Sequence, residues 1–104
     1  MAPENQAVEQ FILGTGNALE SLEKARNVAL DTAAKLYKAD ELSLEDLKTA
    51  RSISKKFDVA YKAAAEALSD FAKASRSGES VTNASVEAAL TAVRSALTEL
   101  KGEI

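Results

Sequence analysis

One unbroken heptad stripe in the middle of the chain constrains the fold more than any other feature. Its residues alternate in steps of three and four, which places all of them on one side of a long helix. The stripe consists of Leu47, Ala50, Ser54, Phe57, Tyr61, Ala64, Leu68 and Phe71. A second stripe with the same steps contains Val86, Leu90, Val93, Leu97, Leu100 and Ile104. Both stripes predict helices that pack against other helices.

Capping signals give the bounds of the second and third helices. Ser43 and Asp46 have the spacing of a capping box, which predicts a helix over about 44–75. Gly78 is suited to the left-handed conformation that commonly follows a helix. A third helix is expected over about 84–101. This third helix has three alternative N-caps, Thr82, Asn83 and Ser85, and Gly102 is placed to end it. On the second helix, Leu42 and Leu47 are placed to form a hydrophobic staple.

The first main helix is expected over about 17–38, because apolar residues recur there at helical spacing. Gly14 and Gly16 precede it, and a glycine inside a helix costs about 1 kcal/mol. We therefore expect a short N-terminal helix over about 4–13 that is kinked at the glycines or separate. The predicted face of the main helix is Ala18, Leu22, Ala25, Ala29, Ala33 and Leu36, widened by Val28, Leu30 and Tyr37.

Together these signals predict a single all-α domain over residues 1–104, an antiparallel bundle of three main helices. The third helix is shorter, so part of the apolar strip on the first two is expected to stay open. The segment around Phe11 or a second chain could cover that strip. Alanine stripes on the second and third helices predict two neighbours for each helix. These neighbours belong either to the same chain or to another subunit.

The 104 residues contain no cysteine and no histidine. This composition removes thiolate nucleophiles, the soft metal ligands and the imidazole proton shuttle. We therefore expect no enzyme activity, no cofactor, no metal site and no small-molecule substrate. The apolar runs are shorter than the ~20 residues of a membrane span. The N-terminal residues lack the positive charge of a signal peptide, which makes a cytoplasmic location the expectation.

A row of basic residues lies on the predicted second helix. Lys48, Arg51, Lys55 and Lys62 share helical spacing, so they could meet the phosphates of a nucleic acid or another polyanion. The alternative is a solvated face, since Lys62 could pair with Asp58 one turn before it. The net charge of -3 argues against non-specific binding of polyanions.

Two other features have simpler structural explanations. Asp40, Glu41, Glu45 and Asp46 lie near a predicted helix start, where carboxylates complement the helix dipole. They lack the ligand spacing of a calcium-binding loop. Ser54 puts a hydroxyl on an apolar stripe. It could bond back to its own helix or fix the register between two helices.

The runs Ala60–Leu68 and Val86–Leu97 are rich in alanine and repeat at helical spacing. In these runs the chain resembles small alanine-rich helical proteins encoded in bacteriophage and prophage genomes, whose roles are mostly unassigned. The resemblance covers about the second half of the chain. It implies a phage or bacterial origin and an accessory role, and it carries over no functional residue.

These observations predict a non-catalytic interaction or assembly module that associates with itself through its helices. Phe11 and Ile12 are the candidate contacts with a protein partner. One alternative is a polyanion or nucleic-acid binder that uses the basic row. Another is a small inhibitor that binds a host protein.

Overall fold

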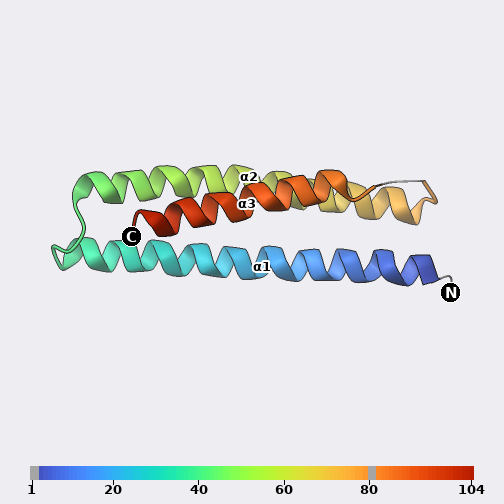
Figure 1. Ribbon diagram of the computed structural model, residues 1–104, viewed down its shortest axis with the longest axis horizontal. Coiled ribbons are helices and arrows are strands. Elements are labelled where there is room, and N and C mark those ends of the chain that lie inside the picture. Colours follow the sequence, from blue (N-terminus) through green and yellow to red (C-terminus); the bar gives the residue numbers. More distant parts are fainter. Residues whose placement is uncertain (1–2, 80–81) are drawn as a thin grey trace.

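The computed structural model describes residues 3–79 and 82–104, and it confirms the all-α prediction (Figure 1). Helix α1 spans Pro3–Lys38, α2 spans Leu44–Arg76 and α3 spans Ala84–Gly102. The three helices run up, down and up in a rod of 58 × 18 × 15 Å. The third helix is the shortest, so it does not extend to the end of the rod near the α1–α2 turn. Only α1 and α2 run along that end.

Helix α1 is continuous through Gly14 and Gly16, so the expectation of a separate N-terminal helix over about 4–13 was wrong. Side chains on both sides of the glycines explain this continuity. Ile12 packs against the core, and Thr15 and Leu19 are buried. Tertiary contacts of this kind outweigh the local preference of two glycines.

We predict that Gly14→Ala and Gly16→Ala each stabilise the protein by about 0.4–1 kcal/mol. A Cβ atom built at either position meets no atom within 4 Å, and both residues have helical backbone conformations. The added methyl group should therefore act mainly by restricting the unfolded chain. Urea unfolding followed by circular dichroism measures the change. A lower stability in either variant would mean that the helix is distorted at the glycines.

The structure confirms the predicted signals at Ser43 and Gly78, whereas Asn83 precedes α3 without a side-chain capping hydrogen bond. The Ser43 hydroxyl accepts a hydrogen bond from the backbone N–H of Asp46 at 3.1 Å, as a capping box requires. Gly78 adopts the left-handed conformation after α2, with φ of 82°. The α1–α2 turn uses Asp40 in the same role, with φ of 59°. Both turns are therefore set by local backbone conformations that follow directly on the helix ends.

The core consists of two clusters of buried residues. Around Phe57, the three helices contribute large side chains such as Leu19, Leu68 and Val93. Toward the α1–α2 turn, Ala33 and Ala50 are completely buried, and Leu100 near the end of α3 packs in the same cluster. These small residues allow the two long helices to close on one another. The other buried residues of this cluster are Ala29, Leu47 and Ile53. Part of the expected apolar strip nevertheless stays open, as a hollow beside the end of α3 that is lined by Ala25, Val28 and Ile104 among other residues.

The buried face of α1 differs from the prediction. Thr15 and Leu19 are buried, while the predicted Ala18 and Ala25 are half-buried on the side of α3. Val28 is 66% exposed and does not widen the core. The predicted stripe on α3 is buried from Val86 to Leu100, but Ile104 is exposed. The true seam of α1 consists of Thr15, Leu19, Leu22, Arg26, Ala29, Ala33 and Leu36.

Candidate functional site

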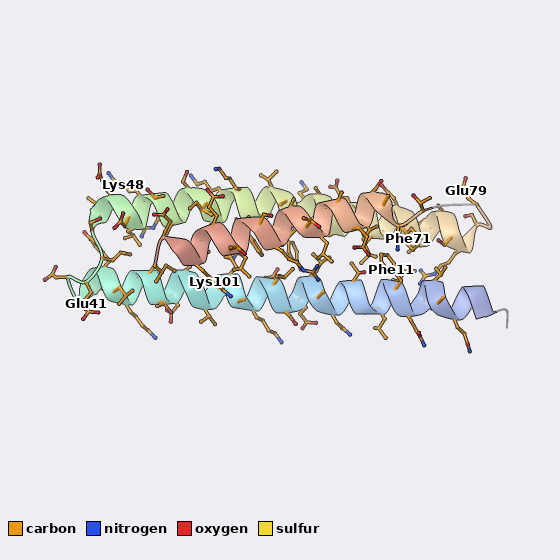
Figure 2. All side chains as sticks on the ribbon, in the orientation of Figure 1. Phe11, Glu41, Lys48, Phe71, Glu79 and Lys101 are labelled. Atoms are coloured by element: carbon orange, nitrogen blue, oxygen red, sulfur yellow. The ribbon has the colours of Figure 1, made fainter. Side chains whose placement is uncertain are left out.

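The basic row predicted on α2 forms an exposed outer face. Lys48, Arg51, Lys55 and Lys62 are all exposed, and Figure 2 shows Lys48 on the side of α2 that points away from the other helices. Within the described residues, none of the four forms an ion pair. This face therefore presents four cations that are free to meet an anionic partner.

An apolar side chain lies in the middle of this basic face. Val59 is 73% exposed and lies between Lys55 and Lys62. Beside it a shallow hollow of about 460 Å³ is lined by side chains of α2. The lining residues are Ser52, Lys55, Lys56, Val59, Ala60 and Ala63. Val59 is not part of the apolar stripe predicted on this helix. Its exposure was therefore not predicted from the sequence.

The expected pairing of Lys62 with Asp58 does not form, because Asp58 is bound by a cation of α1. The Arg26 guanidinium forms an ion pair with the Asp58 carboxylate. It also donates a hydrogen bond to the Ser54 hydroxyl at 3.3 Å. Ser54 thus contacts the neighbouring helix, which favours the hypothesis that it helps to fix the register of α1 on α2.

Arg26 lies inside the bundle rather than on its surface. Its side chain is 15% exposed, and its guanidinium carbon lies 5.0 Å from the centroid of the Phe57 ring. A cation over an aromatic face is attracted by the ring quadrupole. The partners of Arg26 are all intramolecular, so we assign this cluster to the architecture of the bundle.

Tyr61 belongs to the border of the same cluster. Its ring stacks on Phe57 with 6.0 Å between the centroids. Burial raises the pKa of the Tyr61 hydroxyl above 10.0, and the neighbouring carboxylates of Glu23 and Glu20 raise it further. The stacking on Phe57 and the contact with the core make Tyr61 a packing residue.

The predicted partner contacts Phe11 and Ile12 are half-buried and pack against the core of their own chain. The Phe11 ring meets Phe71 of α2 edge-on, with 5.2 Å between the centroids (Figure 2). Phe11 also lines two shallow hollows beside α3. Its contact with a protein partner stays a prediction, whereas its contact with Phe71 is part of the fold.

The outer face of α1 carries a second exposed apolar residue, which the sequence analysis did not single out. Leu13 is 66% exposed. Glu9 lies one turn before it and Glu20 two turns after it, and both are exposed. Glu9 is bound by Arg76 of α2 at 3.3 Å, and Glu20 pairs weakly with Lys24 at 3.6 Å. Both carboxylates near Leu13 are therefore balanced by cations of the same chain, and the surface around Leu13 carries no net acidic charge from them.

A further apolar hollow of about 470 Å³ lies between α1 and the end of α3. Val28 and Ile104 are exposed at its border, and Lys24 and Lys101 flank it. The hollow is open to solvent along its length. Its lining consists of apolar side chains, the two lysines and Thr32, whose hydroxyl donates a hydrogen bond to the Val28 carbonyl of its own helix at 2.9 Å.

Over residues 3–79 and 82–104 the chain has neither the clustered ligands of a metal site nor a helix suited to span a membrane. No three acidic side chains come together there in a way that could hold a metal ion, and the acidic residues Asp40, Glu41, Glu45 and Asp46 are exposed. No helix in the same residues is long and apolar enough to cross a membrane.

Comparisons with known proteins add no relative to this description. No protein-family model matches the chain, and neither the curated proteins nor the solved structures contain a match to it.

Proposed function

We propose that this chain is a non-catalytic assembly module that associates with copies of itself through the outer faces of its helices. One observation carries this proposal. The chain buries its core with its own three helices, and it still exposes Leu13, Val28 and Val59 on the outside of the two long helices. These side chains are not needed to close the core.

The chemistry of the side chains supports a role in contacts. Histidine and cysteine are absent, and the described hollows are open and shallow. The elongated rod offers long helical faces rather than an enclosed pocket. Faces of this kind are suited to helix–helix contacts between molecules.

Light scattering during size exclusion tests the proposal across a tenfold dilution at low salt. We expect a mass above the 11.0 kDa of one chain, which falls on dilution. A mass of one chain at every concentration would refute self-association.

The polyanion alternative has one observation in its favour, the four exposed cations of α2. It can be measured separately, by titration with a single-stranded DNA oligonucleotide at low salt. Binding that falls steeply with added salt would support this alternative. Polyanion binding would replace self-association as the proposed function only if the protein alone also stays a monomer.

A further inference from the structure

The outer side of α2 carries lysines that recur at heptad steps. Lys48, Lys55 and Lys62 follow one another every seven residues, and Ser52 and Val59 lie between them at the same spacing. Residues at heptad steps stay in line along a helix that packs on another helix. All five residues of this outer row are exposed, and Figure 2 shows Lys48 pointing away from the bundle. The row therefore has the spacing of a helix–helix contact on the side of α2 that its own chain leaves open.

The charge of the outer row is not neutralised by the chain itself. Within residues 3–79 and 82–104 its three lysines form no ion pair. Asp58 is the only carboxylate of α2 between positions 47 and 65, and it is bound by Arg26. The row ends near Glu45 and Glu66, so the positive charge is confined to the middle of the helix. A partner with carboxylates along about the same length matches this distribution.

The centre of the outer row is apolar. Val59 is 73% exposed, and the hollow of about 460 Å³ beside it is also lined by Ala60 and Ala63. Apolar surface of this kind stabilises a contact when another apolar group covers it. Phosphate groups gain nothing from such a hollow. A membrane surface needs a broad apolar helix face, and one valine beside two alanines is too little for that.

A second copy of the chain does not supply the matching carboxylates along α1. Each acidic residue on the outer side of α1 is already paired with a cation of its own chain. These pairs are Glu9 with Arg76, Glu20 with Lys24 and Asp31 with Lys35. On α3, Glu99 pairs with Lys56 at 3.6 Å. Asp40 and Glu41 lie in the turn at the end of the rod and not along a helix. The outer row is therefore suited to a different molecule.

From these features we infer that the outer row of α2 docks an acidic amphipathic helix of another protein. The carboxylates of the partner lie opposite the three lysines, and an apolar residue among them covers Val59. The row from Lys48 to Lys62 is about 21 Å long, so a partner helix of about four turns covers it. One pair of helix faces is a small interface, of the size found in weak complexes.

This inference goes beyond the proposed function, because it assigns one face of α2 to a partner that is not a copy of the chain. Leu13 and Val28 are exposed on α1, outside the outer row. They remain available for self-association while the partner helix is bound to α2.

A synthetic peptide supplies the probe for the test. It is an alanine-rich helix of about 20 residues, with glutamates at heptad steps and leucines between them, so that it complements the outer row. The fluorescence anisotropy of the labelled peptide is followed at low salt as the full chain is added. We expect saturable binding. A peptide of the same composition in scrambled order should bind at least about tenfold more weakly, because its carboxylates no longer form one line.

Variants of the protein locate the contact. Lys55→Glu with Lys62→Glu should weaken peptide binding at least about tenfold, because like charges then face each other. Val59→Ser leaves the charges in place and should weaken binding several-fold, since the leucines lose their apolar contact. Lys38→Glu with Lys101→Glu makes the same change in charge at exposed positions of α1 and α3 and should bind like the wild type. Circular dichroism checks that every variant folds.

Several results would overturn the inference. Equal binding of the ordered and scrambled peptides would mean that only net charge is recognised. Unchanged binding in the Lys55→Glu, Lys62→Glu variant would place the contact elsewhere. A single-stranded DNA oligonucleotide that binds more tightly than the peptide, with no effect of Val59→Ser, would assign the outer row to a polyanion. Binding of phosphatidylserine vesicles but not of the peptide would assign it to a membrane surface.

Light scattering on the same proteins separates this inference from the proposed function. The Lys55→Glu, Lys62→Glu variant should keep the self-association of the wild type. If its mass fell instead, a second copy would occupy the outer row, and the inference would be wrong while self-association stood. A wild-type protein that stays a monomer and binds the ordered peptide would refute the proposed function and support the inference.

Discussion

Phe57→Ala is expected to lower the free energy of unfolding by about 3–5 kcal/mol, the usual loss for a buried aromatic residue. The Phe57 side chain is completely buried at the centre of the larger part of the core. Its ring stacks on Tyr61 and lies under the guanidinium of Arg26. Removal of the ring leaves a cavity and takes away the surface on which Arg26 rests. A loss of this size is a large part of the roughly 5–15 kcal/mol of a typical domain.

Urea unfolding followed by circular dichroism measures this loss, and Val59→Ala is its matched control. Val59 lies on the same helix two residues further on, but it is 73% exposed. Its truncation should change stability by less than about 0.5 kcal/mol. If both variants lost the same amount, Phe57 would not occupy the core position described above.

The sequence was sufficient to predict helices α2 and α3, the antiparallel order of the three helices and most of the core of α2 and α3. Those helices carry large residues at regular steps, and Leu47, Phe57 and Val93 are buried as the stripes predict. The predicted cap at Ser43 and the left-handed turn at Gly78 also follow from local chemistry alone. Local signals of this kind depend on few residues and are read directly from the sequence.

Helix α1 was harder to predict because its buried face mixes leucines with small residues, a threonine and one cation. Its true seam has the same alternating steps as α2, but it passes through Thr15 and Arg26. The spacing of apolar residues alone favours Ala18 and Ala25. Each lies one position before a true seam residue, Leu19 and Arg26 respectively. The charged Arg26 side chain is stabilised at a seam position because Asp58 and the Phe57 ring lie opposite it on α2. These partners are known only when the two helices are placed together.

The outer faces were missed for a related reason. Stripes of apolar residues identify what a helix buries within its own bundle, and a single exposed apolar residue among charges leaves no period to detect. Leu13 and Val59 become informative once the core is known to be complete without them. The basic row on α2, in contrast, was visible in the sequence because its four cations share helical spacing.

Replacement of both Phe11 and Ile12 by serine is expected to lower the free energy of unfolding by about 3 kcal/mol or more. Both side chains are half-buried against the core, and Phe11 also loses its edge-on contact with Phe71. Serine leaves hydroxyls where apolar atoms were packed. The loss should be visible as an earlier urea transition of the whole protein, because the two residues join α1 to the rest of the bundle.

The neighbouring residue Leu13 supplies the control that separates a core contact from a partner contact. Leu13→Ser should leave the urea transition nearly unchanged, since the side chain is 66% exposed, and it should weaken self-association. The double serine variant at Phe11 and Ile12 should do the reverse, losing stability while its folded fraction still assembles. If the double variant kept its stability and lost assembly, Phe11 and Ile12 would be the partner contacts. The interface would then lie at the border of α1 and α3 rather than on the outer faces.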